Sequence, residues 1–257
     1  MRKTFFLVIA FVSFAVAALG QTKQSEHPGP EIRPNYPNGF HLGLNMQGNL
    51  QQRVKVMPSA NILESSIKSS PRFGYNFGLE ASYHFAKYFG VSVGVDFESK
   101  SSVTIQKKVN DSYTDIVDFG DRSFSIPVRF EFHYPFKESN FSLYTALGVC
   151  FANVYDYTNF CGIYGQVDGV QLNFGDFDDN KPNVSMQLRL GTYYRLPYND
   201  LLRLAITSNL AFKDRLVGSY SYQGENGTLS YRNNSLGLEL SYIHCFRTKE
   251  QKAAIGK

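Results

Sequence analysis

Long apolar runs and tryptophan are what this sequence most clearly lacks. After residues 1–20, no stretch approaches the roughly 20 consecutive apolar residues that a membrane-spanning helix needs, and the mean hydropathy is -0.26. We therefore expect no membrane-spanning helix after residue 20. A membrane barrel is not excluded, because strands that alternate apolar and polar residues average out in a hydropathy window.

Motifs that carry chemistry are also missing. The chain has no His-Glu-x-x-His or Cys-x-x-Cys sequence and no glycine-rich phosphate loop. We therefore expect no enzymatic activity and no cofactor. The three cysteines, Cys150, Cys161 and Cys245, are too few for a disulfide framework. Cys150 and Cys161 could pair in an oxidising compartment, and the sequence leaves that pairing open.

The N-terminus has the features of an export signal. Arg2 and Lys3 precede an apolar run, and Ala18 and Gly20 provide small residues at the usual cleavage spacing. We predict a signal peptide over residues 1–20, with an uncleaved anchor helix as the alternative. Removal of Arg2 and Lys3 reduces the 26 basic residues to 24 against 22 acidic ones, so no strongly basic surface remains for nucleic acid.

The rest of the chain is predicted to be one β domain with short flanking segments. Residues 21–38 are rich in proline and are predicted as a periplasmic linker. Residues 39–246 are predicted as the β domain, and residues 247–257 as a polar tail. Large apolar residues recur at every second position in eight segments, which is the period of a strand with two unlike faces. These segments are 40–50, 73–85, 89–100, 124–134, 141–153, 184–196, 202–212 and 236–246.

The connections between the eight segments alternate strictly between short and long. In an antiparallel up-and-down barrel this puts the short turns and both barrel termini at one rim and the long loops at the other. Each segment is long enough to cross a bilayer, for which about 9–11 tilted residues suffice. The sequence thus predicts an all-β, eight-stranded transmembrane barrel in the outer membrane.

The two faces of the strands differ in a way that fixes their orientation. One phase is rich in Phe, Leu and Val, too bulky to fit together inside an eight-stranded barrel as in a lipocalin. The other phase holds glycine, small residues and charges of both signs. We predict that the apolar phase faces lipid and that the polar phase fills the lumen. Its ionisable residues are Glu80, Asp96, Glu98, Arg129, Glu131, His133, Arg189, Arg195, Arg203 and Glu239.

Charges confined in a narrow lumen should pair with one another, because an isolated buried charge costs several kcal/mol. We expect Arg129, Arg189 and Arg203 to be bridged by Glu80, Glu131 and Glu239 into a network that plugs the barrel. An acid–base site or a selective filter is the alternative role for these residues.

Two metal sites are conceivable, and both are expected to be solvated groups without metal. His41, His84 and His133 could gather at the periplasmic mouth, where we expect solvated histidines. Asp176, Asp178, Asp179 and Asn180 offer oxygen ligands for Ca²⁺, but not at EF-hand spacing. In strand 124–134, Pro127 removes a ladder donor, so we expect a local bulge there.

Three segments carry a family resemblance: Ser123 to Phe132 (SFSIPVRFEF), Tyr144 to Gly148 (YTALG) and Ser235 to Tyr242 (SLGLELSY). Over about residues 39–246 the chain resembles the PorT-like outer-membrane β-barrel family of Bacteroidota. That resemblance implies a barrel in the outer membrane. Some members are accessory parts of a protein secretion system, and no catalytic residue carries over.

The sequence therefore favours a non-enzymatic, lipid-embedded barrel with a structural or interaction role. The predicted loops 154–183 and 213–234 are rich in Tyr, Asn, Gly and Ser, a composition suited to binding a protein or other surface ligand. Three alternatives stay open: a secretion-system component, a small-solute channel and an enzyme with its site at the outer rim.

Overall fold

The computed structural model describes ten segments, and every regular element in them is a β-strand. They are residues 39–59, 66–70, 73–109, 112–136, 139–156, 165–167, 169–174, 183–196, 200–214 and 216–246. Within these segments, no helix has the length and apolarity needed to span a bilayer. The predicted signal peptide (1–20), linker (21–38) and tail (247–257) lie outside the described residues.

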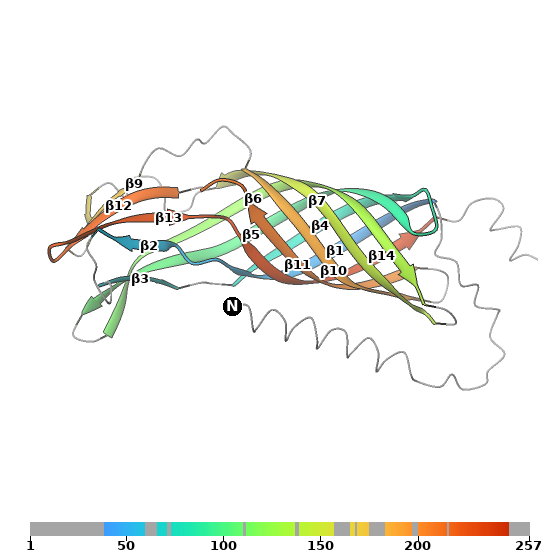
Figure 1. Ribbon diagram of the computed structural model, residues 1–257, viewed down its shortest axis with the longest axis horizontal. Coiled ribbons are helices and arrows are strands. Elements are labelled where there is room, and N and C mark those ends of the chain that lie inside the picture. Colours follow the sequence, from blue (N-terminus) through green and yellow to red (C-terminus); the bar gives the residue numbers. More distant parts are fainter. Residues whose placement is uncertain are drawn as a thin grey trace, which may run out of the picture.

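Eight long strands form a closed antiparallel barrel (Figure 1). Each strand pairs with its neighbours in the chain, β1 closes against β14, and a β5–β6 pairing completes the ring. The predicted eight-stranded up-and-down barrel is confirmed. The strands are β1 (Gly39–Gln51), β4 (Phe73–His84), β5 (Phe89–Val109), β6 (Ser112–Pro135), β7 (Phe141–Asp156), β10 (Asn183–Arg195), β11 (Leu201–Ala211) and β14 (Ser235–Cys245).

One end of the barrel carries the short turns. These turns join β4 to β5, β6 to β7 and β10 to β11. The start of β1 and the end of β14 meet at the same end, where the Phe246 amide donates to the Phe40 carbonyl at 3.1 Å. In barrels of the outer membrane the short turns face the periplasm, so we refer to this end as the periplasmic end.

The opposite end carries a second, five-stranded sheet. Its order is β2 (Lys55–Pro58), β13 (Glu225–Tyr231), β12 (Leu216–Tyr222), β9 (Val170–Phe174) and β8 (Gly165–Val167). A further short strand, β3 (Ile67–Ser70), pairs with the outer part of β5. We call this sheet, β3 and the outer ends of β5 and β6 the cap; Figure 1 shows it beyond the barrel, away from the short turns.

The cap corrects the prediction that the long connections are loops. Segments 154–183 and 213–234 contain β8, β9, β12 and β13, and residues 101–123 are largely strand, because β5 and β6 run on past the expected ends. At about 3.3 Å per residue, the 21 residues of β5 span about 70 Å. That length is more than twice the apolar band of about 25 Å on a membrane barrel, so β5 carries the chain from lipid into the cap.

The barrel faces are assigned as the sequence predicts. Along β4, Phe77, Leu79 and Tyr83 are exposed, whereas Asn76 and Glu80 are buried in the lumen. The same alternation runs along β1 and β14. The barrel therefore presents an apolar surface to lipid and encloses polar side chains.

A bulge in β5 reverses this alternation where the strand enters the cap. Lys100 pairs with Asp121, but Val103 pairs with Phe119, so β5 contains one extra residue between the two pairs. An extra residue turns the following side chains to the other face. Odd-numbered residues such as Val93 and Phe97 are exposed on the barrel, yet Ile105 is fully buried in the cap.

No bulge occurs at Pro127, where one was expected. The pairing of β6 with β7 continues in register through Pro127 and Cys150. The reason lies on β5: a Cβ at Gly94 would stand 3.2 Å from the Pro127 Cγ, so the absence of a side chain at Gly94 makes room for the proline ring.

Candidate functional site: the lumen and the cap

Glu80 is the centre of an ion-pair network in the lumen. Its Oε2 atom lies 2.7 Å from Nη1 of Arg129 and 2.7 Å from Nη1 of Arg189. Its Oε1 atom lies 2.8 Å from Nη1 of Arg203. All four side chains are buried. One carboxylate therefore holds three guanidinium groups.

The network crosses the barrel from wall to wall. Glu80 is on β4 and Arg189 on β10, which are four strands apart in a ring of eight and so face each other across the lumen. Glu239 on β14 adds a second bridge, 2.8 Å from Arg189 Nη2 and 2.7 Å from Arg203 Nη2. The ion pairs therefore span the lumen from one wall to the other at this height.

Uncharged polar side chains accept further hydrogen bonds from the arginines. Arg203 donates to Ser241 Oγ at 3.1 Å and to the Tyr144 and Tyr193 hydroxyls at 3.3 and 3.4 Å. Arg129 Nε donates to Gln187 Oε1. Sequence reasoning missed Gln187, Tyr144, Tyr193 and Ser241. The sequence feature that could have identified them is their position in the lumen-facing phase of the strands, which also holds the charged residues.

One predicted member of the network is wrong, and another residue takes its place. Glu131 was expected to bridge the arginines, but its carboxylate contacts His84 Nε2 at 3.1 Å and the Tyr144 hydroxyl at 3.4 Å. The third carboxylate on the arginines is Asp96, 3.4 Å from Arg129 Nη2. Alternation assigns a residue to the lumen, but the stagger of neighbouring strands sets its height along the barrel.

Glycines provide the space that these large side chains occupy. A Cβ at Gly78 would lie 1.9 Å from Asp96 Oδ1, and one at Gly148 would lie 2.8 Å from Arg129 Cα. Both distances are shorter than side chains tolerate. The lumen glycines are thus part of the site, because a side chain there would displace the charged groups.

The chemistry open to this network is limited. Arg129, Arg189 and Arg203 are balanced by Glu80, Glu239 and Asp96, and each carboxylate is engaged with a guanidinium. A general base needs a carboxylate that can reach a substrate proton. These carboxylates are buried and held by arginine, an arrangement that suits a structural role.

A layer of histidines lies at the periplasmic end of the lumen. The rings of His41 and His84 are 4.4 Å apart, and those of His84 and His133 are 4.3 Å apart. These side chains were expected to be solvated, but all three are buried, with at most 1% of their surface exposed. The lumen is narrow here, and Tyr144 and Tyr193 pack beside His133.

The cap has an apolar interior and a polar outer face. Val54, Ile67, Ile105, Val170, Leu172, Tyr220, Tyr222 and Leu229 form its buried core. On the other face of the sheet, Met57, Thr228, Ser219 and Asn173 align in one row across four strands. Apart from Met57, this row is polar and uncharged, with hydroxyl and amide groups.

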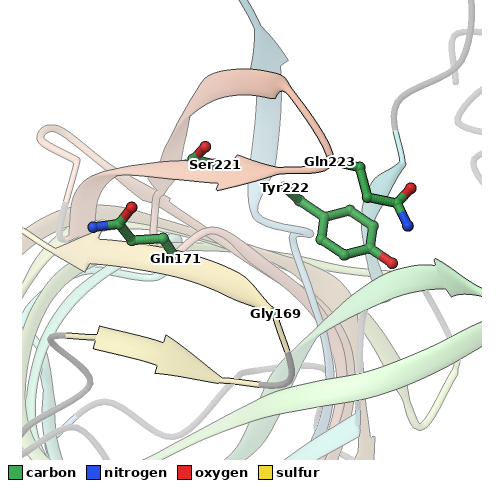
Figure 2. A pocket seen from close by; sticks show the side chains of 5 residues that line it. All are labelled: Gly169, Gln171, Ser221, Tyr222 and Gln223. Atoms are coloured by element: carbon green, nitrogen blue, oxygen red, sulfur yellow. The ribbon is translucent and has the colours of Figure 1, made fainter.

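A hollow of about 290 Å³ opens at the tip of the cap, lined by Gly169, Gln171, Ser221, Tyr222 and Gln223. Figure 2 shows Gln171 and Ser221 on neighbouring strands, with Tyr222 and Gln223 at the β12–β13 turn. Its polar lining belongs to the same sheet as the outer face.

The remaining predicted groups lie wholly or partly outside the described residues. Asp176, Asp178, Asp179 and Asn180, the expected solvated acidic group, are outside, and so is Cys161. Cys150 is a buried free cysteine, as is Cys245.

Comparison with known proteins gives a family and a set of similar barrels. Residues 34–216 match the family model of the outer membrane protein beta-barrel domain. No curated protein matches the chain in sequence. Among solved structures, OprG of Pseudomonas aeruginosa is 12% identical, with 83% of this chain and 99% of that chain covered and a TM-score of 0.49. Neisserial surface protein A is 14% identical, with 81% and 98% covered and a TM-score of 0.43.

Proposed function

We propose, from the premise that this chain belongs to the outer membrane protein beta-barrel domain family, that it is a plugged, non-enzymatic barrel whose cap binds a partner at the cell surface. The chain is an outer-membrane protein, so its barrel lies in lipid and its long connections point outward. The observation that carries the proposal is the contrast between a lumen closed by ion pairs and a cap built as a separate folded sheet.

The closed lumen supports a role other than conduction. The Glu80–Arg189 pair joins opposite walls, and Arg129 and Arg203 fill the space beside it. Opening this path would separate buried charges that are now paired, which is energetically unfavourable. A small-solute channel is therefore the weaker candidate.

The outer face of the cap supports a binding role. It carries a row of exposed side chains, Thr228, Ser219 and Asn173, on three paired strands. Hydroxyl and amide groups adapt their hydrogen bonds to many partners, and a twisted sheet holds them in fixed positions. We propose this face as the contact surface; Thr228, Ser219 and Asn173 lie within 154–183 and 213–234.

A more specific proposal is that the chain belongs to the PorT-like branch and takes part in protein secretion. It is supported by the Ile126-Pro127 strand and by the glycine-containing strand that follows it. In that case the partner is another protein of the secretion machinery, and it would co-purify with the barrel.

Two measurements test the proposal. In planar bilayers the purified protein should show no large, steady conductance, and such a conductance would refute the plug. In a pull-down from detergent-solubilised membranes, the wild-type chain should retain a partner that the double variant Ser219→Arg, Asn173→Arg loses.

The control for the pull-down is Lys213→Glu, an exposed change in the β11–β12 connection, off the outer face. It should retain the partner. Equal capture by the double variant and the wild type would place the contact elsewhere and contradict the assignment to the cap.

A further inference from the structure

The histidine layer contains an arrangement that the ion-pair network does not use. His84 on β4, Glu131 and His133 on β6 each direct one ligand atom into the same region, and these atoms all lie within 4.8 Å of one another. All three side chains are buried. Two imidazole nitrogens and one carboxylate oxygen so close together are the donors of a metal site.

The backbone is shaped to bring His84 and Glu131 together. Gly90 on β5 lies between them, paired with His84 on one side and with Glu131 on the other. A Cβ at Gly90 would stand 2.0 Å from Cδ2 of His84. The imidazole therefore lies over the bare backbone of β5, and from there it reaches the carboxylate on the next strand.

The charge of Glu131 favours a cation at this position. Glu80, Glu239 and Asp96 already balance the three arginines. Among the described residues, Glu131 has no arginine or lysine within ion-pair distance; its carboxylate contacts His84 and the Tyr144 hydroxyl. Buried carboxylates in proteins are paired with a positive group, hydrogen-bonded or bound to a metal, and a cation held between Glu131 and the two histidines would pair with this one.

We infer that His84, Glu131 and His133 bind one divalent transition-metal ion, with Zn²⁺ as the best match. Imidazole nitrogen suits Zn²⁺, whereas Ca²⁺ and Mg²⁺ prefer oxygen ligands throughout. A set of two histidines and one carboxylate leaves a fourth position for water or another ligand. The ring of His41 packs against His84 beside the site, and the Tyr144 hydroxyl orients the Glu131 carboxylate.

The bound ion would tie β4 to β6 across β5 at the periplasmic mouth. It would stabilise the barrel, since a ligand that binds only the folded state shifts the unfolding equilibrium. The site is independent of the cap and of the proposed partner.

The test uses the full chain in detergent, without a polyhistidine tag, titrated with Zn²⁺ against a chromophoric chelator. The wild type should bind one Zn²⁺ per chain, and His133→Gln should weaken binding by more than about 100-fold. The control is His244→Gln, which should leave binding unchanged. His244 lies at the same end but is exposed, with its Nδ1 3.0 Å from Asp200.

A second measurement needs no variant and so does not depend on whether His133→Gln folds. The X-ray absorption spectrum of the Zn²⁺-loaded wild type should show a nitrogen and oxygen shell at about 2.0–2.1 Å with the scattering pattern of two imidazoles. Absence of stoichiometric binding, a shell without imidazole, or full binding by His133→Gln would each overturn the inference. In the first case, His84 and Glu131 form only an ion pair.

Discussion

The barrel and the cap bury opposite kinds of side chain. In the barrel, Arg129, Arg189 and Arg203 are among the most buried residues, while Leu79 is 61% exposed. In the cap, Leu172 and Leu229 are fully buried, and Thr228 is exposed. The difference follows from the solvent on the outside, which is lipid around the barrel and water around the cap.

Strand β5 passes through both regions and shows how one chain meets both requirements. Its alternation is continuous from Phe89 to Ser99, and the bulge before Val103 then brings Ile105 to the inside. Without the extra residue, Ile105 would point outward into water. The bulge between Lys100 and Val103 thus marks where the surroundings of the strand change from lipid to water.

Loss of the central carboxylate should have the largest effect on the barrel. Glu80→Ala leaves three buried guanidinium groups without their shared partner, and we expect it to lower the free energy of unfolding by about 3–5 kcal/mol. The measurement is urea unfolding of the detergent-folded barrel, followed by the gel shift between folded and unfolded forms.

The control is an ion pair on the surface of the molecule. Arg232 and Asp214 contact each other in a solvent-exposed setting, so Asp214→Asn should cost at most about 1 kcal/mol. If the two variants lost similar stability, the lumen network would not be the main polar support of the barrel.

Removal of apolar volume should instead affect the cap. Leu229 is fully buried in the cap core, so Leu229→Ala should cost about 2–5 kcal/mol. We expect the loss to appear as faster proteolysis and amide exchange in β12 and β13, with an unchanged gel shift of the barrel. If the variant lost the gel shift of the folded barrel together with the protection of β12 and β13, the cap and the barrel would unfold as one unit.

The same substitution on the two outer surfaces should give unequal results. Leu188 faces outward on β10, and Leu188→Arg should cost about 2–4 kcal/mol if it lies near the bilayer midplane. Thr228→Arg, on the water-facing side of the cap, should change stability by at most about 0.5 kcal/mol. Unfolding in lipid vesicles measures both, and equal costs would contradict the assignment of lipid to the barrel.

Sequence alone was sufficient for the barrel because its strands are long and their alternation is strict. The eight segments, the polar lumen and the outward apolar face all follow from a period of two. The same pattern did not predict where each lumen side chain lies along the barrel axis. Glu131 was therefore paired with arginines, although the structure places it beside His84, and the histidines were expected in water, although tyrosines cover His133.

The cap was missed because its strands are short and rich in Gly, Ser and Asn. β8 has 3 residues and β2 has 4, too few for a period to stand out. Turn signals were present. The pairs Asp168-Gly169 and Gln223-Gly224 each separate two segments that are strands in the structure, and a pair of this kind between extended segments is typical of a tight hairpin.

The β12–β13 turn offers the smallest predicted effect and the finest test of how the cap is built. Gln223 and Gly224 both have positive φ, 50° and 81°, as a two-residue hairpin turn requires. No heavy atom lies within 4 Å of a Cβ placed on Gly224, so Gly224→Ala should cost only the backbone strain of about 1–2 kcal/mol. Gln223→Gly should relieve strain and stabilise the hairpin slightly. Amide exchange in β12 and β13 measures the effect of both substitutions. If long-range packing were the main support of the cap, neither substitution would change the exchange rates.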